Sequence, residues 1–196
     1  MRRLFKKKIL LLSFFGLIVL GSFGIWQLFG KAEKINLPNE ISTEAMAIAS
    51  LGRDISSFGF DEKSLNEIKS KLLAGSHSDI ISTIEAELRK SKVIELRSIE
   101  LLKKLELAGI SLDAVTPETV KQSTFKALEG ESQVVRNFVN YRNDLDEFLR
   151  LVTSNYFYGG DDTASLDTLI ERLIFSKKAM EEKSSASANI LENLGK

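Results

Sequence analysis

The fold is decided by one stretch of the chain, residues 79–108, which reads DIISTIEAELRKSKVIELRSIELLKKLELA. Apolar and small residues recur in it at steps of three or four, which is the spacing of one face of an α-helix. At ~1.5 Å per residue, a helix of this length would be about 45 Å long. Two serines fall on this face, and we expect them to let a neighbouring helix come close; a niche for a polar ligand is the alternative. The expected stripe consists of Ile81, Ile84, Leu88, Ser91, Ile94, Ser98, Leu101 and Leu105.

Two shorter helices are predicted before this stretch. Pro38 is expected in the first turn of one of them, because its missing N–H is not needed there. Asp61 is expected to cap the other, and Gly75 to end it in a left-handed conformation. Ser76 and Asp79 resemble a capping box at the start of the long helix. The stripes of the two shorter helices consist of Ile41, Ala45, Ile48, Leu51 or Gly52, Ile55, Leu65, Ile68 and Leu72.

Two more helices are predicted after the long stretch. The run Thr116-Pro117-Glu118 combines a hydroxyl cap, a proline at the first helical position and an acid near the positive end of the helix dipole. We expect this helix to be nicked near Gly130. The last helix carries a serine-rich segment that either frays or packs closely through its small side chains. The stripes consist of Val135, Phe138, Tyr141, Leu145, Phe148 and Val152, then Leu166, Ile170, Leu173, Met180 and Leu191.

These patterns predict an all-α fold. No segment alternates apolar and polar residues over the length of a strand. Heptads persist for a few turns and are then broken by glycine or proline, which favours helices folded back on themselves over one long coiled coil. We therefore expect residues 38–196 to form an antiparallel bundle of four to five helices, long enough to bury a sizeable core.

The N-terminus predicts a membrane anchor. Residues 9–29 form an uncharged, apolar run that would span roughly 30 Å as a helix, the thickness of a bilayer core. Five Lys or Arg residues lie within residues 1–8. The positive-inside bias places this basic flank in the cytoplasm. We therefore expect a transmembrane signal anchor at 9–29, in contact with the lipid bilayer, and a linker at 30–37. The alternative is a cleaved signal peptide with Ser22-Phe23-Gly24 as its cleavage site.

The orientation of this anchor would make residues 38–196 an extracytoplasmic domain. We expect a single-pass protein of a bacterial inner membrane, with its C-terminal domain in the periplasm or outside the cell. The basic N-terminus leaves the rest of the chain mildly acidic, although the full chain has 27 basic and 27 acidic residues. A mildly acidic body does not suit nucleic acid, whose phosphates attract basic surfaces.

The composition also argues against catalysis and cofactors. The chain has no cysteine and one histidine, His77. The absence of cysteine excludes disulfides, thiolate metal sites and a cysteine nucleophile. With one histidine, the chain also has too few ligands for a typical zinc site and little basis for a His-based catalytic triad. His77 is expected in a solvated turn. We expect neither an enzyme nor a cofactor-binding protein.

One segment stands out as a candidate site, NYFYGGDDTAS at 155–165. Its glycines and acids suit a turn between two helices, and its aromatics would then close the end of the core. A partner or ligand contact is the alternative, because exposed aromatics are favoured anchors. An EF-hand calcium loop would need alternating acids and a terminal Glu, which are absent. The candidate contact residues are Tyr156, Phe157, Tyr158, Asp161 and Asp162.

Residues 159–162, Gly-Gly-Asp-Asp, also resemble the signature loop of diguanylate cyclases, in which Gly-Gly is followed by Asp or Glu and then Glu-Phe. In this chain Asp162 and Thr163 replace the Glu-Phe. The strands that such a fold requires are not predicted on either side, and an extracytoplasmic segment would lie away from nucleotides. The likeness therefore covers four residues and implies no cyclase activity.

The layout of an anchor followed by a helical bundle favours a binding role. We expect a structural or interaction subunit of an envelope-associated assembly, which contacts a protein partner or a second copy through a helix face. The alternative is a small-molecule sensory or solute-binding bundle. Such a bundle would hold a polar pocket between its helices, with Arg136, Tyr141 and Arg142 as the residues to inspect.

Overall fold

The computed structural model describes residues 35–158 and 163–194. All of its helices belong to one compact unit that begins at Asn36. They are α2 (Asn39–Ser56), α3 (Glu62–Leu73), α4 (His77–Ile110), α5 (Glu118–Tyr158) and α6 (Thr163–Leu194), with a short 3₁₀ helix at Leu112–Ala114. The described residues contain no strand, only an isolated bridge between Asn36 and Thr116. The predicted all-α class and the number of helices are confirmed.

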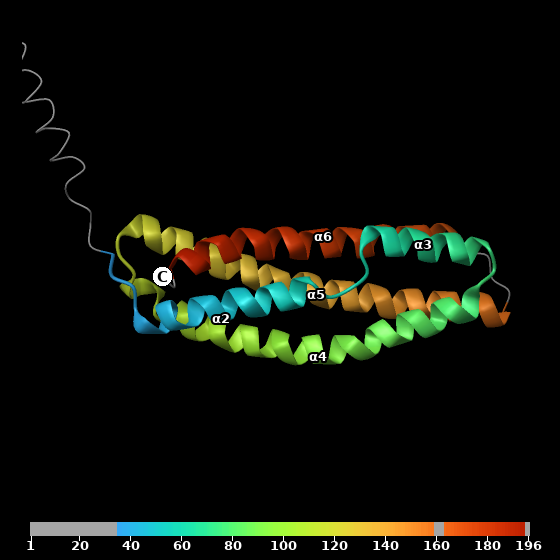
Figure 1. Ribbon diagram of the computed structural model, residues 1–196, viewed down its shortest axis with the longest axis horizontal. Coiled ribbons are helices and arrows are strands. Elements are labelled where there is room, and N and C mark those ends of the chain that lie inside the picture. The colour runs from blue at the N-terminus through green and yellow to red at the C-terminus, as the bar shows by residue number, and fades with distance from the viewer. Residues whose placement is uncertain (1–34, 159–162, 195–196) are drawn as a thin grey trace, which may run out of the picture. The chain divides into compact units, whose positions relative to one another are not determined.

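The helices form an up-and-down bundle (Figure 1). Helices α2 and α3 follow one another in the same direction, α4 returns, α5 runs out again and α6 returns. Packing joins α5 to α6, α6 to α2, α2 to α4 and α4 to α5, which closes a ring of four positions. The consecutive helices α2 and α3 thus fill one position of a four-helix bundle.

The predicted basic flank at 1–8 and the predicted anchor at 9–29 lie outside the described residues, as does most of the linker at 30–37. Within the part of the chain that is described, no helix is both long and apolar enough to cross a membrane. The anchor therefore remains a prediction from the sequence.

Local signals set most of the helix ends. The side chain of Asp61 accepts a hydrogen bond from the backbone N–H of Ser64 at 2.7 Å, as expected for an N-cap. Gly75 has φ +82° and ends the α3 segment in the left-handed region that glycine tolerates. The predicted capping box is wrong, because the side chain of Ser76 makes no cap hydrogen bond. Helix α4 begins at His77, so this histidine lies in a helix and not in a loop.

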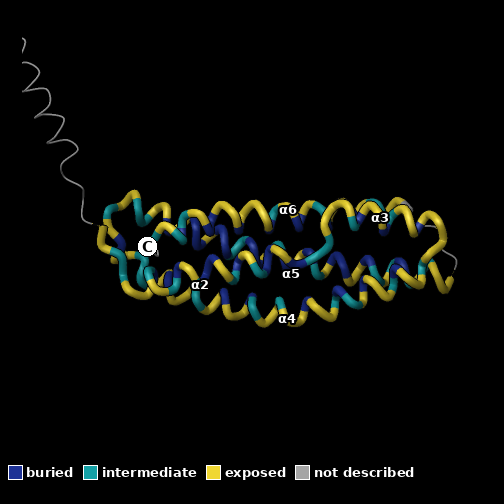
Figure 2. The backbone as a smooth tube through the Cα atoms, viewed as in Figure 1, coloured by how far each residue is buried: buried dark blue, intermediate teal, exposed yellow. Residues whose placement is uncertain are grey.

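The core follows the predicted stripes (Figure 2). Every stripe residue predicted for α5 and α6 is buried. Ser91 and Ser98 are also buried, and their hydroxyls donate to the backbone carbonyls of Leu88 and Ile94 at 2.7 and 2.9 Å. Because each hydroxyl is satisfied within its own helix, these serines act as small residues at a helix contact and form no ligand niche.

The expected nick at Gly130 is wrong, because α5 runs unbroken through it. The reason for this glycine is packing: a side chain there would overlap the hydroxyl of Ser187 on α6. Ser184 and Ser187 are both buried, so the serine-rich end of α6 packs closely and does not fray. Small residues on the two helices therefore let α5 and α6 approach closely.

Candidate functional site

Three aromatic residues form an exposed surface at the end of α5. Tyr156, Phe157 and Tyr158 are 50%, 68% and 87% exposed. The ring of Tyr156 stacks on His77, the first residue of α4, with 5.9 Å between ring centroids. It also meets Phe157 edge-on at 4.9 Å. We call these four residues, His77 and Tyr156 to Tyr158, the distal aromatic cluster.

The expectation that these aromatics close the core is wrong. Val152 is the last buried residue of α5, and the helix continues for another turn and a half beyond it. The aromatic side chains on this extension have no core beneath them and face solvent. Asp161 and Asp162, the other two candidate contact residues, lie outside the described residues.

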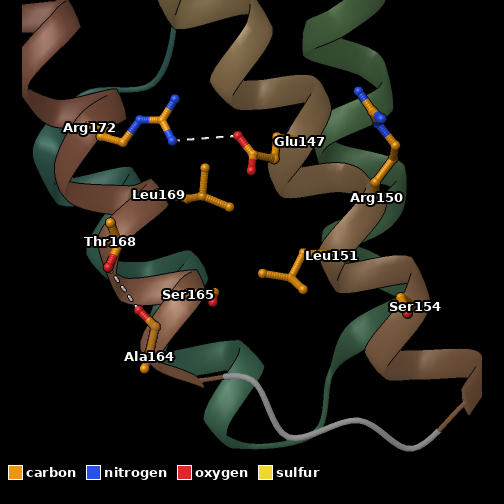
Figure 3. Close-up of a pocket in the computed structure, with 9 residues that line it drawn as sticks. All are labelled: Glu147, Arg150, Leu151, Ser154, Ala164, Ser165, Thr168, Leu169 and Arg172. Atoms are coloured by element: carbon orange, nitrogen blue, oxygen red, sulfur yellow. Dashed lines mark hydrogen bonds and ion pairs between the residues drawn. The ribbon is translucent and has the colours of Figure 1, made fainter.

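A groove lies between α5 and α6 close to the same end of the bundle (Figure 3). Its volume is about 590 Å³. Its charged residues already have partners: Arg172 bonds Glu147 at 3.5 Å and also pairs with the buried Asp144, and Arg150 pairs with Asp146 at 2.9 Å. The lining consists of Glu147, Arg150, Leu151 and Ser154 from α5, and of Ala164, Ser165, Thr168, Leu169 and Arg172 from α6.

A buried acid outside the groove, Asp144, pairs with Arg172 on the groove wall. Burial raises the pKa of Asp144, and the guanidinium of Arg172 opposes this by favouring the carboxylate. Arg172 is half-exposed at the rim, so its charge is largely committed to holding Asp144 and Glu147. The groove thus combines hydroxyl groups with charged side chains on its walls.

The three residues proposed for a sensory pocket do not converge. Tyr141 is fully buried, and its hydroxyl accepts a hydrogen bond from the backbone N–H of Phe60 at 2.8 Å. Burial also raises the pKa of Tyr141. Arg136 is exposed and Arg142 is half-buried. Tyr141 therefore serves the joint between α2 and α3, where it packs beneath Gly59.

One buried acid was missed by the sequence reasoning. Glu131 is fully buried, and neither carboxyl oxygen has a hydrogen-bond partner among the described residues. Burial raises its pKa to about 8, although Arg53 lowers it somewhat. Glu131 lies four residues before Val135 and thus continues the apolar stripe of α5. This spacing places Glu131 in line with the stripe, but the enclosure of its carboxyl group depends on Gly52 of α2.

The described residues hold no group of three or more His, Asp or Glu side chains that could bind a metal. No protein-family model, curated protein or solved structure matches this chain. A function for this chain is therefore proposed from the geometry of the bundle and the pattern of the sequence.

Proposed function

We propose that this protein is a membrane-anchored, extracytoplasmic helical bundle that acts as a structural or interaction subunit of an envelope-associated assembly. The observation that carries the proposal is the distal aromatic cluster. Exposed Tyr and Phe side chains supply large contact areas with few rotatable bonds, which makes them frequent anchors of protein interfaces. The occupant we propose for it is an apolar segment of a protein partner.

The bundle suits the presentation of this cluster. Asn36, where the chain enters the bundle, pairs with Thr116 just before α5 begins. Helix α5 has 41 residues and spans about 60 Å at ~1.5 Å per residue. The cluster lies at the far end of α5. The bundle therefore acts as a rigid spacer between the point of chain entry and the aromatic surface.

The anchor in this proposal rests on the sequence. Residues 9–29 would contact the lipid bilayer, with residues 1–8 in the cytoplasm. An anchor confines the bundle near the membrane and raises its effective concentration toward other membrane-bound proteins. Carbonate extraction and N-terminal mapping of the mature chain test this part. We expect the intact N-terminus in the membrane fraction; loss of the residues before about Lys31 would contradict a signal anchor.

Photo-crosslinking in cells tests the role of the cluster. The full chain would carry a photoreactive phenylalanine in place of Tyr158, and in a second strain in place of Phe125. Phe125 is a matched control, because it is a 54% exposed aromatic at the other end of α5. We expect a discrete crosslinked partner from position 158 only.

A second variant decides whether the crosslink reports recognition or mere proximity. Adding Phe157→Ala to the chain with the probe at 158 should abolish the crosslink, whereas adding Phe125→Ala should leave it unchanged. A crosslink that survives Phe157→Ala, or no crosslink from position 158 in the native cell, would refute the cluster as a docking surface.

A second candidate, a small-molecule sensory or solute-binding bundle, is supported by the groove between α5 and α6. Hydroxyl groups on its walls, such as that of Thr168, could orient a small polar solute. Thermal unfolding of the full chain in the presence of candidate solutes tests it. A rise in Tm that Thr168→Val removes would favour this function, and no rise with any solute would count against it.

A further inference from the structure

Helix α4 carries a second apolar stripe on the side that faces solvent. Its apolar members are Val93, Leu96, Leu107 and Ile110, which are 55%, 69%, 55% and 74% exposed. Figure 2 shows exposed chain along the outer side of this helix. The buried residues of α4, such as Ser91, Ser98 and Leu101, lie on the opposite side. Because the other side of α4 packs into the bundle, this outer stripe stays largely exposed within the described chain.

The spacing of the stripe is that of a helix-pairing seam. Starting at Val93, the successive steps to residues 96, 100, 103, 107 and 110 are three, four, three, four and three residues. This alternation keeps one line of side chains on one helix face, as at the a and d positions of a coiled coil. We call this set of six residues the α4 outer seam: Val93, Leu96, Glu100, Lys103, Leu107 and Ile110.

The two central residues of the seam are oppositely charged and unpaired. Glu100 and Lys103 are exposed, and neither forms an ion pair within 4.0 Å with any described residue. Two nearby cations on α4 are committed to the bundle. Arg97 pairs with Asp54 at 2.6 Å, and Lys104 with Glu44, both on α2. Within this part of α4, the seam charges are thus left for an outside partner.

The order of residues along the seam is complementary to its own reverse. When a second copy of α4 lies antiparallel and is centred between Glu100 and Lys103, each Glu100 faces the Lys103 of the other copy. In the same register Val93 faces Ile110, and Leu96 faces Leu107. A parallel pair would place Glu100 against Glu100 and Lys103 against Lys103, and like charges opposite one another are destabilising.

We propose that the α4 outer seam is the interface of a two-fold homodimer, in which two copies of this chain pair antiparallel along α4. Such an interface is isologous: the same residues contribute from both copies, and the two-fold axis passes between Glu100 and Lys103. The apolar pairs at the ends supply buried area, and the central ion pairs fix direction and register. The proposal shares no residue with the distal aromatic cluster and does not depend on it.

The dimer is compatible with two anchored chains. The centre of the seam lies near the end of α4 that is closest to the site of chain entry, since Asn36 donates a side-chain hydrogen bond to Ala114 just beyond α4. Eight to nine residues separate the centre from Ile110, which is about 13 Å of helix. The two Asn36 residues of the dimer would therefore be only about 30 Å apart, measured along the paired α4 helices, a distance that two linkers can span.

Charge reversal tests the interface. The mass of the full chain in detergent would be measured by sedimentation over a range of concentrations, for the native chain, Glu100→Lys, Lys103→Glu and the double reversal. Each single reversal sets like charges against each other twice, so we expect the dimer Kd to rise by roughly tenfold or more. The double reversal recreates both pairs and should restore the native Kd. A monomeric native chain, or a double reversal no better than the singles, would overturn the proposal.

Cysteine crosslinking tests the register, because the native chain has no cysteine. Full chains with Val93→Cys and Ile110→Cys would be treated with a bis-maleimide of about 10 Å reach, matched to the distance between packed helix axes. We expect a crosslinked dimer from the mixture and none from either variant alone, because like positions lie about 25 Å apart. Crosslinking of each variant with itself would indicate a parallel pair and refute the antiparallel dimer. A dimer held only by the membrane segment would give no crosslink from the mixture, and this result would also refute the α4 interface.

Discussion

The carboxyl group of Glu131 on α5 occupies the space that a side chain at Gly52 on α2 would fill. Neither carboxyl oxygen has a hydrogen-bond partner in the described bundle. The absence of a side chain at Gly52 thus creates room for a buried acid between two helices. An unpaired carboxylate is costly in such a place, so the acid holds its proton to a higher pH than usual.

Filling this space should destabilise the fold. We expect Gly52→Ala to lower the free energy of unfolding by about 1–3 kcal/mol, because the added methyl overlaps the buried Glu131 carboxyl and forces it to move. Gly109→Ala is the matched control. That glycine lies in α4 with open space where its Cβ would be, and alanine there should be neutral or stabilising by up to about 1 kcal/mol. Urea unfolding followed by circular dichroism measures both. Equal effects at the two positions would contradict the assignment.

The stability of the bundle should fall as the pH rises from about 5 to 8. The pKa of Glu131 is about 8 in the folded chain and has the ordinary value of 4.5 in the unfolded chain. Below pH 4.5 both states hold the proton. Between pH 4.5 and about 8 the unfolded chain has released the Glu131 proton and the folded chain still holds it. The free energy of unfolding therefore falls as the pH rises through the folded pKa. One pKa unit corresponds to about 1.4 kcal/mol, and the total change should be a few kcal/mol.

The substitution Glu131→Gln isolates this effect, since it keeps the shape of the side chain and removes its titration. We expect its free energy of unfolding to depend less on pH than that of the native chain, and to exceed the native value at pH 8. The pKa of Asp144 is also raised, but this residue titrates in both proteins. Its contribution to the pH dependence of stability therefore cancels in the comparison. Parallel stability curves for the two proteins between pH 5 and 8 would show that Glu131 is not the titrating group.

The hydroxyl of Tyr141 should stabilise the joint between α2 and α3. Tyr141→Phe removes the acceptor of the Phe60 N–H and leaves that donor unpaired. The expected cost is about 1–3 kcal/mol in thermal or urea unfolding. Tyr158→Phe, in which the lost hydroxyl is on an 87% exposed side chain, should change stability by less than about 0.5 kcal/mol. A negligible effect of Tyr141→Phe would mean that water replaces the hydroxyl.

The pair of Arg172 and Asp144 should behave as a coupled unit. Arg172→Met leaves the buried Asp144 carboxylate without its cation, and we expect a loss of about 1–3 kcal/mol. Adding Asp144→Leu removes the orphaned charge, so the double variant should recover part of this loss. Additive effects in a double-mutant cycle, measured by urea unfolding, would show that the two residues do not interact.

Most of the helices could be predicted from the sequence because their signals are local. The cap at Asp61 and the left-handed Gly75 act within one turn of chain, and α5 begins at Glu118, directly after Thr116-Pro117. The stripes of α5 and α6 repeat often enough to identify the buried residues. The predicted break at Gly130 is wrong. Glycine disfavours helix in its local sequence, but here its missing side chain makes room for Ser187 of α6.

The candidate site was predicted only in part. The aromatics at 156–158 were singled out by composition, but their exposure depends on how far α5 extends beyond the residues that α6 and α4 cover. The stripe from Val135 to Val152 does not include Glu131, and its acidic side chain gives no local signal of burial. Its burial became clear only once α2 presented Gly52 opposite it.

The all-α class, the places of the helices along the chain and the buried face of each helix follow from local sequence patterns. These properties follow from spacing and capping, which are set within a few residues. The tertiary structure decided which helices are neighbours, that Glu131 is buried without a partner, that the aromatics at 156–158 face solvent and that α4 keeps a second apolar stripe outside the bundle. Burial at these positions depends on residues far away in the chain, so no local pattern could fix it.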